Sequence, residues 1–531
     1  MTWEAIMSQI NEQQQRRKKV AYTLKIKPSE AVRCSGRRII STYRTEFMRD
    51  RDRVLYCKAF RRLAGKAQVF ISGVDDHKRT RLTHTLEVSQ IARSVAEPLN
   101  LDVNLVEAIA LGHDLGHTPY GHVGERTLHE IMTPQENHVL GTRCPLNIPI
   151  SFRDSDEEAQ ACRDRIAAAY GDFLGFKHNL QSIVVAMKLE RNYEEVGLDL
   201  TNYTLYGIQA HSGGQYKPRR ISNHDCLGYY RAYLENGCRT ADGKPAWSLE
   251  GMLVAEADEI AQRHHDVEDA LLGGLITPAE VVKIIRECFR EFKPFKKLTS
   301  HERRMLNHPE NYDLGEFVSL ISRILINMMV NRLTLVAAYH MNCIGADHKV
   351  SGNNFGKFRA AHDPKDDLFR MVFSYSYTPE EAEDENGFAK RLGKFQNIIN
   401  QRVLSSYDIQ KADAQGKYII TKLFQAYYTT PQQLPDHCVY EMLSAYHELD
   451  RKAYLTDPKS RERFWKYSEK ELREKARKEG IGSVRQLFSD MFANRGETMD
   501  VEELMLMRVI CNHIAGMTDL YAHKVYEEMY S

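Results

Sequence analysis

The sequence predicts an all-α protein with a helical core and an additional helical C-terminal region. Apolar residues recur at three- and four-residue steps through much of the chain, as on the buried face of a helix, whereas the alternating pattern of a strand is rare. The 531 residues are also enough for a large core and for several domains. We expect an N-terminal helical arm over 1–45, a core over 46–280 with an insertion at about 133–165, and a helical region over 281–531.

The charge balance excludes a strongly basic or acidic protein. The 73 Lys and Arg residues balance 72 Asp and Glu residues, so the net charge is +1 and no overall field favours nucleic acid. Basic clusters at 13–19, 217–220 and 456–480 are typical of solvated surface. They are also the places at which single-stranded DNA would be tested, because Lys and Arg bind its backbone.

The cysteines and the apolar pattern of the sequence indicate the cellular compartment in which the protein is expected. The ten cysteines are scattered without a CxxC pair, which argues against structural zinc and against a disulfide-stapled secreted fold. The N-terminus lacks the pattern of a signal peptide, and we find no uninterrupted apolar stretch of membrane-spanning length. We therefore expect a cytoplasmic protein with no membrane contact.

Two predicted helices near the start of the core carry histidines. The apolar spacing over 82–95 predicts a helix with His84 near its start. A second helix is marked by apolar residues over 105–110, and its buried side continues to His113. A further helix is predicted over 247–261. Facing helices are a common source of metal ligands, because their side chains can project into one site.

Glycine and proline then predict irregular structure. Gly116, Pro119 and Gly121 break the helical pattern, so we expect His117 and His122 to lie on a turn-rich loop. The segment 133–160 is rich in proline and is expected to be an insertion loop, and 209–245 is expected to be a loop or a short hairpin.

His84, His113 and Asp114 are candidate metal ligands. Asp114 follows a helix end, where a carboxylate opposes the negative end of the helix dipole, and a bound cation would offset this repulsion. Imidazole and carboxylate ligands suit a borderline-hard divalent ion such as Mn²⁺, Fe²⁺ or Mg²⁺. A lone histidine on a helix is more often a structural residue, whereas the adjacent His113–Asp114 pair is more specific to a metal site.

His122 and Glu125 are candidates for proton transfer beside this metal. They lie three residues apart and become neighbours if a helix begins near Val123. A carboxylate can orient a catalytic imidazole and hold one of its tautomers. Glu125 could equally stabilise the N-terminus of the helix, and the two roles are compatible. The combination of metal and proton-transfer groups indicates a metal-assisted hydrolase.

Seven motifs, in order along the chain, resemble the HD-domain deoxynucleoside triphosphate triphosphohydrolases, the bacterial dGTPase family. The central three are RLTHTLEVSQIAR (81–93), LGHDLGHTPYGHVGE (111–125) and EADEIAQRHHDVEDAL (256–271). The other four are TEFMRDRDRVLYCKAFRRLAGKAQVF (45–70), FKHNLQSI (176–183), LDLTNYTLYGI (198–208) and IAGMTDLYA (514–522).

The resemblance implies an all-α HD-domain fold and the hydrolysis of a dNTP to a deoxynucleoside and intact triphosphate. It places the metal ligands at His84, His113, Asp114 and Asp258, of which Asp258 rests on the resemblance alone. His122 and Glu125 match the family's catalytic pair. The substrate contacts that it implies are Gln68, Arg81, His117, Asn179 and Asp266.

These assignments are chemically coherent. A triphosphate carries about four negative charges near neutral pH, and a divalent ion with Arg81 and donating histidines would balance them. An acidic residue at position 266 can accept a hydrogen bond from the 3′-hydroxyl, and close packing under the sugar would exclude a 2′-hydroxyl.

Three positions depart from the family pattern. Ala67 stands where threonine is common, and this change should be harmless. Gln262 replaces a frequent tyrosine. This change puts in doubt any aromatic stacking against the sugar or base, and hence the base preference. Leu520 replaces a frequent arginine and removes a charge from a possible regulatory or subunit contact.

The predicted activity is metal-dependent hydrolysis of dNTPs, with dGTP favoured. One divalent ion per site is expected, Mn²⁺ or Mg²⁺ before Fe²⁺, Co²⁺ or Ni²⁺. The resemblance also implies a homo-oligomer, with a hexamer favoured, and admits single-stranded DNA or a dNTP as effector. The C-terminal region would contribute to the substrate pocket and to oligomer contacts.

Two other functions stay open. The first is hydrolysis of a different nucleotide phosphoester. Gln68, Arg81 and Asp266 argue against this alternative, because they match a dNTP pocket. A nucleotide sensor would be expected to lack a metal ligand, and none of the expected ligands is missing.

Overall fold

The structure is a computed structural model that describes residues 20–37, 43–68, 79–132, 175–193, 197–211, 228–292, 298–404, 407–449, 468–492 and 501–530. These residues confirm the all-α fold, since they form helices and only isolated β-bridges. The basic segments 13–19 and 217–220, the whole of the expected insertion at 133–165, and the first part of 456–480 lie outside the described residues.

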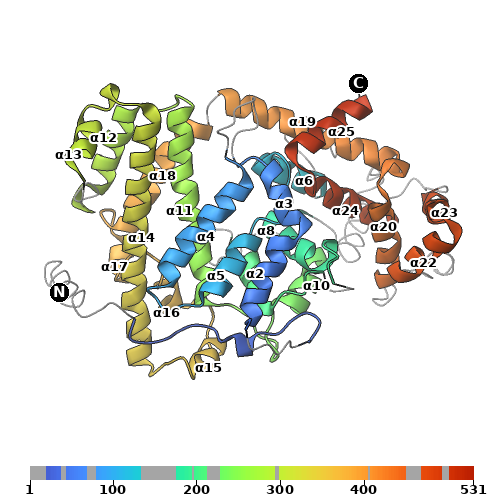
Figure 1. Ribbon diagram of the computed structural model, residues 1–531, viewed down its shortest axis with the longest axis horizontal. Coiled ribbons are helices and arrows are strands. Elements are labelled where there is room, and N and C mark those ends of the chain that lie inside the picture. The colour runs from blue at the N-terminus through green and yellow to red at the C-terminus, as the bar shows by residue number, and fades with distance from the viewer. Residues whose placement is uncertain are drawn as a thin grey trace, which may run out of the picture.

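The N-terminal half forms a bundle around which the rest of the chain is arranged (Figure 1). Its helices are α2 (Glu46–Tyr56), α3 (Lys58–Arg62), α4 (Arg81–Ala96), α5 (Val103–Gly112), α6 (Gly121–Met132), α8 (His178–Val184), α9 (Asn202–Ala210), α10 (Gly228–Gly237) and α11 (Leu249–Leu272). Helix α4 packs against α5 and α11, and α5 also packs against α2 and α9.

A second group of helices covers one side of this bundle, at the left of Figure 1. It comprises α12 (Pro278–Phe289), α13 (Ser300–Asn307), α14 (Leu314–Asp347), α15 (Phe355–Ala360), α16 (Asp367–Arg370), α17 (Pro379–Glu383) and α18 (Phe388–Leu404). One apolar core runs from α4, α5 and α11 into α14 and α18. The domain division proposed at 280 stays a prediction.

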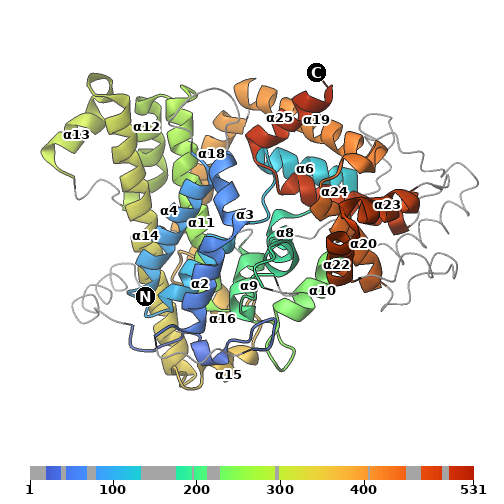
Figure 2. The ribbon, with the colours of Figure 1, turned by 45° about the vertical axis from the view of Figure 1, so that its right-hand side comes forward.

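The C-terminal helices lie on the opposite side (Figure 2). They are α19 (Tyr407–Thr429), α20 (Asp436–Leu449), α22 (Glu469–Glu479), α23 (Ile481–Phe492), α24 (Val501–Ala515) and α25 (Asp519–Tyr530). Their apolar core includes residues of α6, and α19 packs directly against α6. The last quarter of the chain therefore supports a helix of the N-terminal bundle.

Helix α14 is the most apolar long helix among the described residues, although Arg323 and Arg332 interrupt its apolar sequence. By length and composition alone this helix is apolar enough to cross a membrane, with a mean hydropathy of 1.4 over its most apolar window. Half of that window is buried inside the protein, and α14 packs against α11. Its apolar character therefore fits a helix of the protein core.

Two expectations need correction. His122 is not in the loop, because α6 begins at Gly121 and includes it. The segment 209–245 is not wholly irregular, because α10 occupies Gly228–Gly237. In its described part, an isolated bridge joins Arg239 and Pro245.

Candidate metal centre and active site

Two helix ends meet at one buried site. Thr80 caps α4 by accepting a hydrogen bond from a backbone N–H in the first turn, which places Arg81 and His84 at the start of that helix. Helix α5 ends at Gly112, so His113 and Asp114 follow it directly. All four of these functional side chains are almost fully buried.

The four expected metal-binding side chains lie close together. Nε2 of His84 is 3.0 Å from Oδ1 of Asp258, which α11 contributes. Nε2 of His113 is 3.8 Å from that oxygen and 3.6 Å from Oδ1 of Asp114. Bonds of about 2.1 Å to a single ion place neighbouring ligand atoms about 3 Å apart, so small movements would let this set close on one ion.

The bonding of His113 fits a metal ligand. Its Nδ1 donates to the carbonyl oxygen of Ala110 at 2.6 Å, which directs the lone pair of Nε2 toward the cluster. That Nε2 is buried and has no hydrogen-bond partner. Because an unpaired buried polar atom is costly, a bound ion is a fitting partner for it. Two imidazoles and two carboxylates suit Mn²⁺, Fe²⁺ or Mg²⁺.

Both candidate carboxylate ligands favour the ionised state. Burial raises the pKa of Asp114, but the neighbouring His113 ring and the Arg81 guanidinium hold that pKa well below its usual range. Burial also raises the pKa of Asp258, which the hydrogen bond from His84 and the charge of His113 hold below its usual value. Ionised carboxylates are the form that binds a cation.

Arg81 extends this cluster with an unpaired guanidinium edge. Its Nη1 donates to Oδ2 of Asp114 at 2.7 Å, while its buried Nε and Nη2 have no partner. An unpaired guanidinium edge next to a cation site fits a phosphate, which accepts hydrogen bonds from arginine in a bidentate manner.

Glu125 does not bond to His122 at hydrogen-bond distance. Its Oε2 is 3.9 Å from Nδ1 of His122, although the two residues are neighbours on α6 as expected. The carboxylate instead forms short contacts with Nδ1 of His178 and with Nζ of Lys177. Burial raises the pKa of Glu125, but the charge of His178 and the contacts from His122 and Lys177 hold it far below its usual value.

A continuous line of histidine rings joins the two clusters. From the metal cluster, the ring centroids of His113 and His211 are 5.0 Å apart, and those of His211 and His178 are 5.4 Å apart. His178 stacks on His117 at 4.4 Å, and His117 lies 5.4 Å from His122. The side chain of His122 is 58% exposed, so the line ends at an accessible imidazole.

The loop between His113 and α6 is held by close packing. Gly116 lies against α8, where a Cβ would come within 2.2 Å of the backbone nitrogen of Ser182. Tyr120 has a φ of 59°, an uncommon conformation for a residue with a side chain. Its backbone N–H is bound by Asp519 at 2.9 Å, which gives the IAGMTDLYA motif a structural role.

The other substrate positions differ in their surroundings. Oε1 of Gln68 is buried without a partner. Nδ2 of Asn179 donates to the carbonyl of Gln209 at 2.6 Å, so part of its amide joins α8 to α9. Asp266 lies eight residues after Asp258 on α11, or about 12 Å along the helix. It accepts a hydrogen bond from Gln396 at 2.7 Å.

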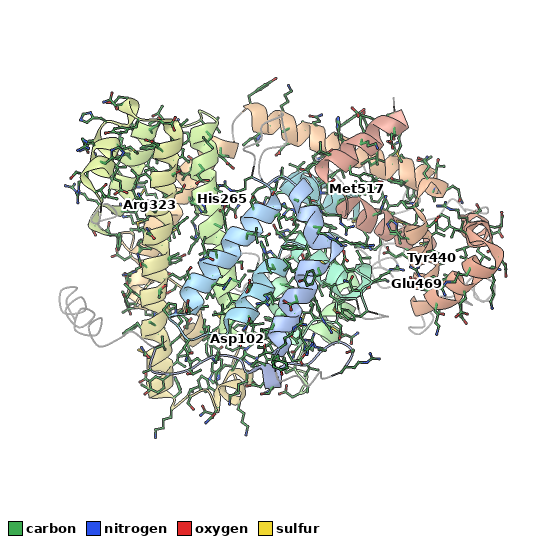
Figure 3. The ribbon with its side chains drawn as sticks, in the orientation of Figure 1. Asp102, His265, Arg323, Tyr440, Glu469 and Met517 are labelled. Atoms are coloured by element: carbon green, nitrogen blue, oxygen red, sulfur yellow. The ribbon has the colours of Figure 1, made fainter. Side chains whose placement is uncertain are left out.

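Three further histidines at this site are not among the residues that the sequence predicts for it. His178 and His211 belong to the line of rings, and the signal for His178 was its place beside Asn179 in the FKHNLQSI motif. His265, labelled in Figure 3, lies 5.3 Å from the ring of His84 and contacts Glu87 of α4. No residue near His211 signalled its role.

Comparison with protein-family models identifies the class of this site. Residues 81–143 match the HD domain, and residues 383–457 match the phosphohydrolase-associated domain. The HD match begins at Arg81 and includes His84, His113 and Asp114. The fold is therefore that of an HD-domain phosphohydrolase.

Curated relatives define the family. The chain is 32% identical over 400 residues to a deoxyguanosinetriphosphate triphosphohydrolase-like protein of Rhizobium etli, covering 75% of this chain and 80% of the relative. A relative with the same name from Agrobacterium fabrum is 34% identical, with 75% and 80% covered, and one from Roseobacter denitrificans is 38% identical, with 50% and 57% covered. The chain belongs to the family of deoxyguanosinetriphosphate triphosphohydrolase-like proteins.

Proposed function

We propose that the protein hydrolyses deoxynucleoside triphosphates, with dGTP preferred, to a deoxynucleoside and inorganic triphosphate. The observation that carries this proposal is the position of the unpaired edge of Arg81 directly beside a set of donor atoms sized for one ion. Such a site suits a metal-bound phosphate, and the names of the relatives point to dGTP.

His84, His113, Asp114 and Asp258 would hold one divalent ion, with Mn²⁺ or Mg²⁺ favoured. When bound, this ion supplies Lewis-acid stabilisation of the α-phosphate and lowers the pKa of a coordinated water. Arg81 then donates to phosphate oxygens and balances the charge that develops on them. Burial and the charge of Arg81 lower the pKa of His117 well below its usual value, so this ring is a neutral donor at the phosphates.

The reaction joins a water oxygen to the α-phosphorus and breaks the bond from that phosphorus to the 5′-oxygen. One proton must leave the water and another must reach the 5′-oxygen. His122 is the accessible ring at the end of the histidine line, and we assign proton transfer to it. Glu125 acts through His178 and Lys177, which it contacts directly, and holds this part of the site in place.

The sugar is assigned to the α11 side of the site. Asp266 accepts a hydrogen bond from Gln396. Its carboxyl group is buried away from water, and this burial raises its pKa to about 7. A dry polar contact to the 3′-hydroxyl favours a deoxyribose that fits closely. Gln68 and Asn179 each retain an unpaired buried oxygen that can accept hydrogen bonds from a nucleotide.

Within this proposal the protein is a cytoplasmic homo-oligomer, with a hexamer favoured from the family resemblance. Hydrolysis of another nucleotide phosphoester is the alternative enzyme, and nucleotide sensing without turnover is the alternative of another class.

The test is turnover of each dNTP and of GTP by the purified protein with Mn²⁺ or Mg²⁺. We expect deoxynucleoside release from dGTP, loss of that release in Asp114→Ala, and no turnover of GTP. Asp313→Ala, which removes a helix cap at an exposed site on α14, is the matched control and should retain activity. If none of the four dNTPs is hydrolysed, singly or in mixtures, nucleotide sensing without turnover would explain the site better.

A further inference from the structure

A second cluster of candidate metal ligands lies outside the histidine site, where α20 packs against α24 (Figures 1 and 2). His437 and Cys438 are the second and third residues of α20, and His513 lies near the end of α24. The sulfur of Cys438 and one ring nitrogen of each histidine all lie within 4.8 Å of one another. The centroids of the two rings are 5.4 Å apart. The three side chains therefore meet at one point, although two further helices separate them along the chain.

The two helices that carry these residues are fixed in place at this point. Asp436, the first residue of α20, forms an ion pair with Arg485 of α23 at 2.5 Å. Glu441, further along α20, accepts a hydrogen bond at 2.7 Å from Asn512 of α24, which directly precedes His513. These contacts set the spacing of α20 and α24, and ligands that are already in position lose less freedom when an ion binds.

Burial leaves a ring nitrogen of this cluster without a partner. Nε2 of His513 is buried and has no hydrogen-bond partner among the described residues, while Tyr427 packs edge to face on the same ring at 5.3 Å. Because an unpaired buried polar atom is costly, this nitrogen is suited to a bound ion. Cys438 is buried in the apolar core, whereas His437 is exposed and gives an ion a route to the cluster.

The positive charges next to this cluster are balanced. Arg62 and Arg191 both act on the ring of His437. Arg62 pairs with Glu190 at 3.5 Å, and Arg191 forms a close ion pair with Glu469. An incoming cation therefore meets paired arginines at this position.

Both rings are neutral, which is the form of imidazole that binds a metal. Burial lowers the pKa of His513 to about 3, and burial with the charge of Arg191 lowers the pKa of His437 below its usual value. Burial raises the pKa of the Cys438 thiol well above its usual value, so an ion must displace the thiol proton. One S–H bond then breaks, one bond from sulfur to the metal forms, and one proton is released.

We propose that His437, Cys438 and His513 bind one zinc ion that joins α20 to α24. Zinc binds sulfur at about 2.3 Å and imidazole nitrogen at about 2.1 Å, so the cluster needs to close by about 1 Å. Both histidines also line a cavity, from which water can fill the fourth position of a tetrahedral ion. The nitrogen and oxygen ligands of the histidine site favour harder ions, so the two sites would select different metals.

The zinc ion would reinforce the support of the histidine site. Helix α24 ends directly after His513 and leads through Met517, labelled in Figure 3, to Asp519. Asp519 in turn accepts a hydrogen bond from the backbone of Tyr120 at 2.9 Å. This site goes beyond the proposed function and does not depend on it.

The first test is titration of the full-length protein with Co²⁺, followed by absorption spectroscopy. A bond from thiolate to cobalt gives a charge-transfer band in the near ultraviolet, and the four residues expected to bind metal in the histidine site include no cysteine. We expect the band in the wild type, its disappearance when Zn²⁺ is added, and its loss in Cys438→Ser. Cys288→Ser, which replaces another buried cysteine, on α12, is the matched control and should keep the band. Absence of the band from the wild type, or an unchanged band in Cys438→Ser, would overturn the proposal.

The second test replaces the exposed ligand, which leaves the apolar core intact. Zinc affinity is measured by competition with a chromogenic chelator, in proteins that also carry Asp114→Ala to remove a ligand expected at the other site. We expect His437→Gln to weaken zinc binding by about a hundredfold or more, because a direct ligand is lost. His523→Gln, on the exposed face of α25, should change the affinity less than about twofold. Equal affinity in His437→Gln and its parent would contradict the proposal.

Discussion

The carboxylate of Asp519 accepts a hydrogen bond from the backbone N–H of Tyr120 at 2.9 Å, and its second oxygen accepts one from Ala67 at 2.8 Å. The start of the last helix thus holds two segments that flank the histidine site. Tyr120, in its left-handed conformation, directly precedes α6, where His122 is the second residue. The position of His122 therefore depends on a residue almost 400 positions away in sequence.

Asp519→Ala tests this dependence. Two backbone donors lose their acceptor, so we expect the free energy of unfolding to fall by about 2–4 kcal/mol. We also expect kcat to fall about tenfold, because small displacements of catalytic groups are costly. Urea denaturation and steady-state kinetics measure the two effects. Glu527→Gln, on the exposed face of the same helix, should change neither. An unchanged kcat in Asp519→Ala would show that the loop keeps its shape without this anchor.

Metal removal should abolish activity. Treatment with a chelator followed by desalting is expected to reduce dNTP turnover by about a thousandfold or more, and added Mn²⁺ should restore it. His84→Ala should lose both turnover and bound metal, measured by mass spectrometry of metal content. His308→Ala, an exposed histidine, should retain both. Full activity of the metal-free protein would contradict the assignment of the cluster.

The contact between Glu125 and His178 predicts a non-additive pair. We expect Glu125→Gln and His178→Asn each to lower kcat by about a hundredfold, because they disturb the same proton-transfer group. The double variant should then be only slightly worse than either single variant. A double-mutant cycle on kcat, with melting temperatures to verify folding, measures the coupling. Additive losses would mean that the two residues act separately.

Asp266 should control the choice of sugar. Asp266→Ala is expected to lower the ratio of kcat/KM for dGTP to that for GTP by about tenfold or more, since a polar contact to the sugar is lost and space is created. Asp269→Asn, one turn further along α11, is the matched control. An unchanged ratio in Asp266→Ala would show that another part of the pocket recognises the sugar.

Glu250 predicts a pH dependence of stability away from the site. It accepts hydrogen bonds from the N–H groups of Ile26 and Asp102 through Oε1, while Oε2 is buried without a partner. Burial raises its pKa to about 8 in the folded protein, whereas an unfolded glutamate has a pKa of about 4.3. Between these values the folded state binds the additional proton, so stability falls as pH rises through the folded pKa.

Glu250→Gln should remove this dependence while it keeps the acceptor oxygen. We expect the wild type to lose up to about 1.4 kcal/mol per pH unit, relative to the variant, between pH 5 and 8. Guanidinium denaturation at several pH values provides the comparison. Parallel stability curves for the two proteins would show that Glu250 titrates normally.

The helices were largely predictable because local patterns define them, whereas the assignment of His84, His113, Asp114 and Asp258 to a metal stays a prediction. The apolar spacing before His113 and the break at Gly116 placed the helix end correctly. Asp258 could be assigned only through the family resemblance, because a carboxylate on an apolar helix has no local signal for metal binding. Its contact with His84 joins residues 174 positions apart.

Other features depend on tertiary contacts that local sequence does not encode. His211 joins the ring line only because α9 passes beside His113 and α8. Glu125 contacts His178 rather than His122 because α8 brings that ring to its carboxylate.

The most direct test of the central claim is ³¹P NMR of the products of dGTP hydrolysis in ¹⁸O-labelled water. Attack on the α-phosphorus predicts intact inorganic triphosphate that carries the label, together with unlabelled deoxyguanosine. Release of pyrophosphate or monophosphate, or label in the 5′-hydroxyl of deoxyguanosine, would contradict the proposed reaction.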